Sequence, residues 1–143
     1  MLQSLYGYIM LEFNTEATKI LSSQISHLDG KTIEKSLKFI RLLFDWHDNK
    51  NLISTRDPLY FLKRDFYDTI QFSNFLKKGM HVDVGTGAGI PGLILSILRP
   101  SDKFVLVDRR EYPIRFLKHV QLALNLENIS IKQVDVNKLS LSS

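Results

Sequence analysis

Residues 80–92 read Met-His-Val-Asp-Val-Gly-Thr-Gly-Ala-Gly-Ile-Pro-Gly, and this stretch decides the fold. Four of the chain's seven glycines lie in it, at Gly85, Gly87, Gly89 and Gly92. A short apolar run containing one carboxylate, Asp83, precedes the glycines, and an apolar helical stretch follows them. This order predicts a strand, a glycine-rich loop and a helix. Because glycine has no Cβ and tolerates positive φ, and because the next helix begins with unpaired N–H groups, the loop predicts a nucleotide-type ligand site.

Two cofactors compete for this loop. Residues 87–92 match the Gly-x-Gly-x-x-Gly dinucleotide fingerprint, but its first glycine should close the turn after the strand, and Gly85 already holds that place. Residues 83–89 instead read Asp-x-Gly-x-Gly-x-Gly, the loop of S-adenosylmethionine enzymes. A carboxylate at the end of the first strand suits a cofactor that carries an ammonium and a sulfonium, and it would repel a pyrophosphate.

A second carboxylate, Asp108, ends the apolar run 103–108. It lies about 20 residues beyond the glycine loop, where an acid at the tip of the second strand hydrogen-bonds ribose hydroxyls. The spacing therefore supports a nucleotide-type cofactor in either interpretation of the loop.

Composition restricts the remaining possibilities. The chain has 143 residues, of which 44% are hydrophobic and 24% charged, so it can bury a core. It has no cysteine, and its four histidines are scattered, so we expect neither disulfides nor a metal site. No apolar stretch approaches the roughly 18 residues of a membrane span, and the N-terminus does not resemble a signal peptide, so we expect a cytoplasmic protein without a membrane partner. The net charge of +4 slightly favours polyanionic partners.

Periodicity predicts three N-terminal helices, over about 1–28, 32–48 and 57–75. The third begins with Asp57 as a cap and Pro58 at the first helical position. Its predicted inward residues are Leu59, Leu62, Phe66, Ile70 and Phe72. Strands are predicted over about 81–84, 104–107 and 129–134, with helices over 91–98 and from about Pro113. The alternation predicts an α/β fold with a parallel sheet, preceded by a helical region over residues 1–78.

Several short motifs occur in an order that resembles one known family. They are Trp46, Asn51-Leu52, Arg56-Asp57-Pro58, Arg64 with Asp68, the glycine loop with its Pro-Gly end, Arg99-Pro100, Asp108, Arg115-Phe-Leu and Leu126-Glu-Asn128. The chain resembles the bacterial 16S ribosomal RNA guanine-N7 methyltransferases, also called glucose-inhibited division protein B, from about residue 30 onward. The resemblance implies a Rossmann-like S-adenosylmethionine domain from residue 79, 16S rRNA of the 30S subunit as partner, and formation of N7-methylguanine.

The resemblance also implies which residues form the site. Gly85 and Ile90 would contact the cofactor, and Thr86, Gly87 and Gly89 would complete the loop. Asp108 would hold the ribose, and Val136 and Asn137 would border the adenine. The candidates for gripping RNA phosphates are Arg64, Arg109, Arg110, Arg115 and Lys118. No catalytic base is expected, because guanine N7 has a free lone pair at neutral pH.

The chain departs from the family pattern in places. Asp65 stands where relatives usually have His, and residues 109–113 read Arg-Arg-Glu-Tyr-Pro where relatives carry Ser-Leu and a Lys-Arg pair. The resemblance implies a sheet of order 3-2-1-4-5-7-6, of which this chain supplies the first three strands. One edge of the first strand would then lack a partner, so we expect a monomer unless that edge pairs with something. Besides an active methyltransferase, a non-catalytic relative that binds cofactor or RNA and a nicotinamide-binding protein remain alternatives.

Overall fold

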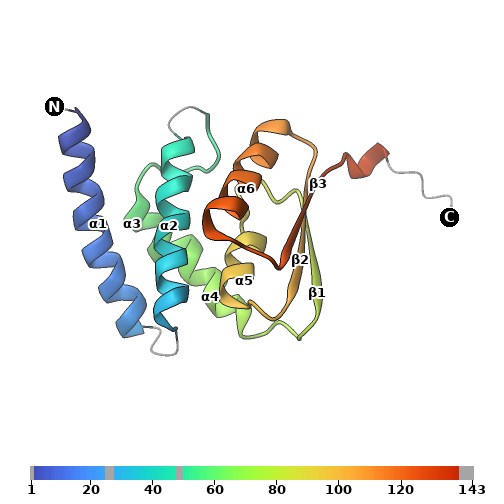
Figure 1. The fold of residues 1–143 in the computed structure, drawn as a ribbon, viewed down its shortest axis with the longest axis horizontal. Coiled ribbons are helices and arrows are strands. Elements are labelled where there is room, and N and C mark those ends of the chain that lie inside the picture. The colour runs from blue at the N-terminus through green and yellow to red at the C-terminus, as the bar shows by residue number, and fades with distance from the viewer. Residues whose placement is uncertain (1, 25–27, 48–49, 139–143) are drawn as a thin grey trace.

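A computed structural model describes residues 2–24, 28–47 and 50–138, with side chains described from Glu12 onward except that of Gln24. Figure 1 shows a chain in which helices come first and strands alternate with helices afterwards. This order confirms the predicted α/β fold class.

Two long helices open the chain, α1 (Leu2–Gln24) and α2 (Gly30–His47). The carboxylate of Asp29 accepts a hydrogen bond from the Thr32 backbone N–H at 2.8 Å. This bond satisfies one of the N–H groups that a helix leaves unpaired at its start, so α2 begins two residues earlier than predicted. Its buried face carries Phe39, Ile40, Leu43 and Phe44, at the spacing expected of one helical stripe.

A third helical rod comprises α3 (Pro58–Phe61), the π-helical turn η1 (Leu62–Phe66) and α4 (Tyr67–Ser73). Asp57 caps it as predicted, because its carboxylate accepts from the Leu59 N–H at 3.0 Å and Pro58 takes the first position. The prediction that Phe72 points inward was wrong. Its side chain is exposed because Thr69, Ile70 and Ser73 occupy the inner face of α4.

The remaining chain forms two successive strand–helix–strand units. Strands β1 (Met80–Val84), β2 (Lys103–Asp108) and β3 (Ile129–Gln133) pair in parallel in the order β1-β2-β3. Helices α5 (Gly92–Leu98) and α6 (Glu111–Leu124) connect them, and a short 3-10 turn, η2 (Val136–Lys138), follows β3. The predicted parallel sheet is confirmed. Because the strands are parallel, their carboxyl ends meet along one edge, and the glycine loop lies there.

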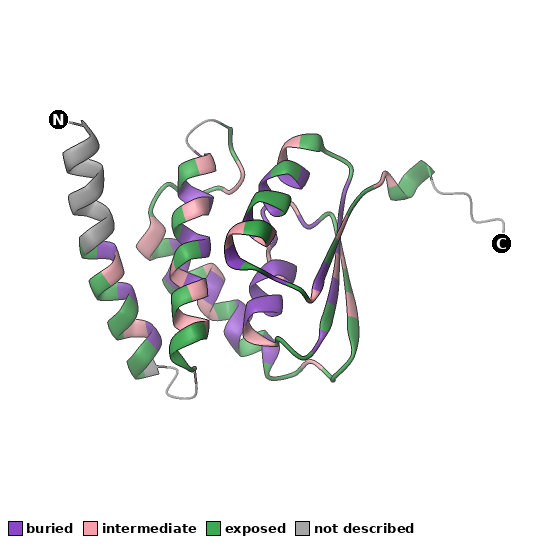
Figure 2. Cartoon of the chain, in the orientation of Figure 1, coloured by how far each residue is buried: buried purple, intermediate pink, exposed green. Residues whose placement is uncertain are grey.

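The helices cover only one face of this sheet (Figure 1). Helices α5 and α6 pack directly on the strands, and α2 and α4 pack behind them, so the core continues from the sheet into the N-terminal helices (Figure 2). None of the described helices covers the opposite face. There β1 exposes Met80, Val82 and Val84, at 68%, 61% and 56% of their surface. The far edge of β1 also has no partner strand within the described residues, as the sequence predicted.

The single tryptophan joins α2 to α6. The Trp46 ring lies 5.6 Å from the Tyr112 ring, 5.6 Å from Phe116 and 5.3 Å from His119, centroid to centroid. The Tyr112 hydroxyl donates to the Trp46 carbonyl at 2.7 Å. Trp46 therefore packs as an inter-helix contact, and it fixes the start of α6 against the end of α2.

Asn128 anchors the opposite, amino-terminal edge of the sheet. Its side-chain amide donates to the carbonyls of Ser96, Arg99 and Asp102, at 3.0, 3.3 and 3.1 Å. These carbonyls belong to the end of α5 and to the turn that leads into β2. One side chain thus ties that turn to the start of β3.

Replacing Asn128 with Ala should lower the free energy of unfolding by about 1–3 kcal/mol, because the carbonyls of the buried residues Ser96 and Asp102 lose this donor. Urea denaturation measures this. Asn51→Ala, which removes the same amide from an exposed position, should change stability by less than about 0.5 kcal/mol. Equal effects of the two substitutions would contradict the anchoring role of Asn128.

Candidate functional site

The glycine loop connects β1 to α5 through three residues with left-handed backbone. Gly85, Gly87 and Gly89 have φ values of 71°, 55° and 88°. Residues that carry a side chain rarely adopt such φ angles. The path of the chain therefore requires glycine at these three alternate positions. The Gly85 and Thr86 N–H groups donate to the Val107 carbonyl at 2.8 and 3.0 Å, which holds the loop against the end of β2.

Asp83 organises the inside of the loop. Its Oδ2 accepts from the Thr86 hydroxyl at 2.7 Å and from the Gly92 backbone N–H at 2.9 Å. The carboxylate therefore caps α5 and folds the loop back onto its own strand. The sequence suggested that the charge of Asp83 attracts a cationic cofactor. In the structure Asp83 does not line the cavity described below, and its carboxylate instead holds the loop in shape.

Gly92 permits this closure by having no side chain. A Cβ at this position would lie 2.5 Å from Leu106 Cδ2 and 2.7 Å from Asp83 Oδ2. These distances are shorter than van der Waals contact, so the helix can approach the sheet and Asp83 this closely only with glycine here.

Asp108 is the buried carboxylate of the site, with 3% of its surface exposed. Oδ2 accepts from the Gly87 N–H at 2.9 Å and from Arg110 Nη2 at 3.1 Å. Oδ1 accepts from the Arg110 N–H at 2.9 Å and from Arg110 Nε at 3.1 Å. Burial by itself raises the pKa of Asp108, but the hydrogen bonds from Arg110 and Gly87 outweigh it and hold this pKa below its ordinary value. The group is therefore an ionised acceptor at neutral pH.

A cavity of about 320 Å³ opens at the carboxyl ends of the strands, beside Asp108. Its lining comes from the ends of β1 and β2 and from the segments that follow the three strands: Val84, Gly85, Val107, Asp108, Arg109, Arg110, Val134, Asp135, Val136 and Asn137. This is the place where ligands of open parallel sheets bind, outside the carboxyl ends of the strands. Its volume lies at the lower end of the range of small-molecule sites.

The structure brings together part of the predicted cofactor set. Gly85, Asp108, Val136 and Asn137 line the cavity, and Gly87 joins them through its N–H on Asp108. Thr86, Gly89 and Ile90 contribute to the loop itself: Thr86 is buried against Asp83, and the backbone N–H groups of Gly89 and Ile90 both donate to the Thr86 carbonyl. Their roles in cofactor binding stay predictions.

The predicted RNA-binding cations lie in three separate places. Arg109 and Arg110 line the cavity, and Arg115 and Lys118 are exposed on α6. Arg64 lies in η1, where it pairs with Asp65 at 2.9 Å and stacks over the Tyr60 ring at 4.5 Å. Among these five cations, Arg110 also hydrogen-bonds to Asp108, a residue predicted to bind the cofactor.

Sequence reasoning did not find three features of the site. Asp135 and Val134 line the cavity, although neither belongs to the glycine loop or to the apolar run that ends in Asp108. The pairing of Arg110 with Asp108 was also missed. Its only signal in the sequence was two arginines following the acid, which is equally typical of a solvated turn.

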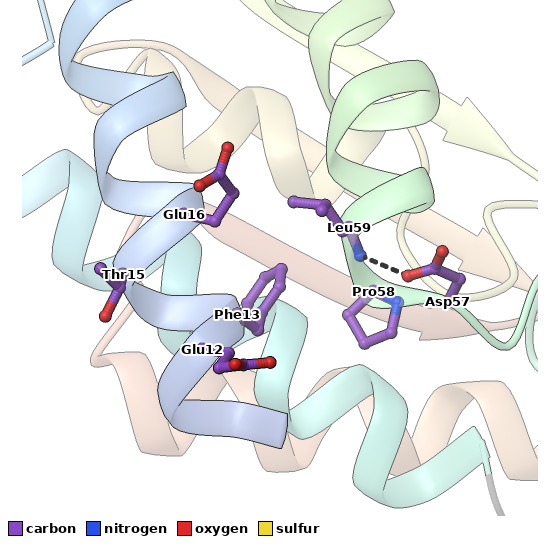
Figure 3. Close-up of a pocket in the computed structure, with 7 residues that line it drawn as sticks. All are labelled: Glu12, Phe13, Thr15, Glu16, Asp57, Pro58 and Leu59. Carbon is purple, nitrogen blue, oxygen red and sulfur yellow. Dashed lines mark hydrogen bonds between the residues drawn. The ribbon is translucent and has the colours of Figure 1, made fainter. Parts of the chain in front are cut away.

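A larger cavity, of about 580 Å³, lies between α1 and α3 (Figure 3). Glu12, Phe13 and Glu16 of α1 face Pro58 and Leu59 of α3, and Asp57 is occupied by its bond to the Leu59 N–H. Its three carboxylates disfavour an anionic ligand, and it has no glycine-lined backbone. The cavity beside Asp108 is therefore the better candidate site.

The described residues contain no cluster of three or more histidine and acidic side chains placed to hold a metal ion. Among the described helices, none combines the length and apolar character needed to cross a membrane.

Acidification should destabilise the protein through Asp108 and Asp102. Hydrogen bonds from Arg99 lower the pKa of Asp102, so both carboxyls bind a proton less readily when folded than when unfolded. The stability that they contribute is present above the ordinary pKa of 3.8 and is lost as pH falls through the lower folded values. Urea denaturation at several pH values from neutral to about 3 measures this. The free energy of unfolding of Asp108→Asn should fall less steeply with pH than that of the wild type. If the free energy of unfolding fell equally steeply in both proteins, Asp108 would not be a source of the pH dependence.

Replacing Gly92 with Ala should lower the free energy of unfolding by about 1–3 kcal/mol, because the new methyl group overlaps Leu106 and Asp83. Gly30→Ala is the matched control, since no atom lies within 4 Å of a Cβ placed there. Thermal and urea unfolding of the two variants compare them. A Gly92→Ala protein as stable as Gly30→Ala would show that α5 does not need this close approach.

Comparison with known proteins agrees with this geometry. Relatives described as "Ribosomal RNA small subunit methyltransferase G" are 38% identical over 110 residues in Yersinia enterocolitica and 40% identical over 103 residues in Shewanella amazonensis. The alignments cover 77% and 72% of this chain, and 53% and 50% of the relatives. The chain therefore spans about half the length of the curated relatives it matches.

A solved structure supports the fold. The chain is similar to a coclaurine N-methyltransferase bound to N-methylheliamine and S-adenosylhomocysteine, with a TM-score of 0.52 and 12% identity. The similarity covers 86% of this chain and 35% of the other. At this identity it is informative about the fold alone.

The model of one protein family, described as rRNA small subunit methyltransferase G (GidB), matches residues 32–142. That match covers α2 from Thr32 onward and the whole strand–helix part with the glycine loop. The chain belongs to the rRNA small subunit methyltransferase G family.

Proposed function

We propose that this chain binds S-adenosylmethionine in the cavity beside Asp108 and takes part in methylating N7 of a guanine in 16S rRNA of the 30S subunit. One observation carries the proposal: a buried, ionised carboxylate and a glycine loop with positive φ meet at one cavity at the carboxyl ends of parallel strands. Membership of the family supports the reaction and the class of substrate.

The residues at the cavity fit an adenosyl ligand. An ionised carboxylate only accepts hydrogen bonds, and a ribose diol offers two donors, so Asp108 suits the sugar. The bare backbone at Gly85 allows close approach. Val136, 40% exposed, and Asn137 offer an apolar surface and an amide at the far wall, which suits the flat, polar-edged adenine.

Bound there, S-adenosylmethionine supplies a methyl group on a sulfonium. The residues of the chain then have to hold and orient the donor, and no side chain has to remove a proton, because neutral guanine N7 attacks with its own lone pair. Rate enhancement would come chiefly from in-line positioning of the two reactants. The proposal therefore requires neither a catalytic base nor a nucleophile at the cavity.

Recognition of RNA would use exposed cations near this edge of the sheet. Arg109 lies at the cavity, and Arg115 and Lys118 lie on the helix that begins beside it. Cations attract the phosphate backbone without reading sequence, so they would position the RNA while the cavity selects the base. Arg64 is a weaker candidate, because Asp65 already neutralises it.

The experiment measures transfer of a labelled methyl group from S-adenosylmethionine to 30S subunits that lack this modification, followed by mapping of the label in 16S rRNA. We expect label at a guanine N7. Asp108→Asn should weaken binding of S-adenosylhomocysteine by about tenfold or more in calorimetry, since a hydrogen bond to a charged group is lost. Asp102→Asn removes an equally buried carboxylate from the opposite edge of the sheet and should leave binding unchanged in folded protein.

A second candidate function is a relative that binds cofactor or RNA without turnover. The unpaired edge of β1 favours it, because within the described residues no strand continues the sheet on that side. Binding of S-adenosylhomocysteine without label transfer would support this alternative. Failure to bind S-adenosylhomocysteine would contradict both functions, and competition by NAD would revive the dinucleotide interpretation of the loop.

A further inference from the structure

Arg110 forms a two-pronged contact with Asp108. Its Nε lies 3.1 Å from Oδ1 and its Nη2 lies 3.1 Å from Oδ2. The Arg110 side chain is 58% exposed, whereas that of Asp108 is 2% exposed. The guanidinium therefore covers the carboxylate from the solvent side of the cavity.

These contacts use the whole accepting capacity of Asp108. An ionised carboxylate has about four lone-pair positions. The Gly87 N–H, the Arg110 backbone N–H and two N–H groups of the Arg110 guanidinium (Nε and Nη2) supply four donors, two on each oxygen. A ribose diol can therefore bind these oxygens only if some of the donors leave.

The four donors differ in their freedom to leave. The Gly87 N–H belongs to the loop, which Asp83 and the Val107 carbonyl hold in place. The Arg110 N–H belongs to the backbone immediately before α6, whose start the contact between Tyr112 and Trp46 fixes. Only the Arg110 side chain is long, half-exposed and free to rotate into solvent.

The guanidinium also lies over the loop itself. A Cβ placed on Gly87 would be 3.5 Å from Arg110 Nη2, so the guanidinium lies next to the side of Gly87 that a side chain would occupy. Arg110 therefore lies beside both the glycine loop and the carboxylate, on their solvent side, which is where the proposed function needs the ribose.

We propose that Arg110 is a displaceable cap on the ribose-binding oxygens of Asp108, and that an adenosyl ligand binds by replacing its guanidinium. This inference rests on the proposed function. Without ligand, the cap gives a buried charge its partner. With ligand, the two ribose hydroxyls donate to Asp108 in place of the guanidinium. A ligand that lacks the diol cannot replace the hydrogen bonds that Asp108 loses when Arg110 leaves.

Calorimetry with S-adenosylhomocysteine tests the cap in wild type, Arg110→Ala and Arg110→Lys. We expect Arg110→Ala to bind about 1.5- to 5-fold more tightly, the range expected for release of a partly exposed ion pair. Arg110→Lys keeps the charge without the fork and should lie between the two. Arg41→Ala, which removes an exposed cation from α2, controls for net charge and should bind as wild type.

Methylthioadenosine separates the ribose from the amino-acid end of the ligand. It keeps the ribose diol but has no carboxylate or ammonium. Its affinity should therefore rise in Arg110→Ala by the same factor as that of S-adenosylhomocysteine. A gain for S-adenosylhomocysteine alone would overturn the proposal, because Arg110 would then act on the charged amino-acid end. Melting curves add an independent readout: Arg110→Ala should melt lower without ligand and should show a larger ligand-induced rise.

The outcomes distinguish this inference from the proposed function. Binding by wild type with unchanged or weaker binding by Arg110→Ala would overturn the cap and leave the cofactor site standing. Binding by Arg110→Ala but not by wild type would support the cap strongly. Absence of binding in both proteins would overturn the proposed function and, with it, the cap.

Discussion

The hydrogen bond from the Gly87 N–H to the buried carboxylate of Asp108 joins the glycine loop to the tip of the neighbouring strand. A buried carboxylate is stable only when donors surround it. The loop supplies one donor, and the start of α6 supplies another through the Arg110 N–H. The loop, β2 and α6 are therefore held in one arrangement by a single charge, and the cavity takes its shape from that arrangement.

Two acids on adjacent strands serve opposite purposes. Asp83, at the end of β1, turns toward the inside of the loop and closes it through Thr86 and Gly92. Asp108, at the end of β2, lies at the cavity, and one of its partners is the largely exposed side chain of Arg110, which the proposed cap would release. The first carboxylate builds the site, and in the proposed function the second one binds the ligand.

Short-range patterns predicted the order and type of most elements. The glycine spacing after Val84 and the pairing of Asp57 with Pro58 specify local backbone, so they could be recognised without tertiary contacts. The π-helical turn at Leu62–Phe66 leaves no such pattern. The direction of Asp83 depends on which face of β1 the helices cover, and the reach of Arg110 depends on side-chain torsions. These two features arise only after the chain has packed, which is why the fold was more predictable than the site. The division at residue 78 stays a prediction, because one core runs through both parts.

The contact of Trp46 with Tyr112 and His119 gives the molecule an optical reporter of its own. Trp46 is the only indole in the chain, so its emission comes from one known place. Tyr112 lies two residues after Arg110, at the first turn of α6. A rearrangement at the carboxyl ends of the strands that shifts this turn would change the surroundings of the ring. Steady-state fluorescence could then follow events at the cavity in unlabelled protein, without any introduced dye.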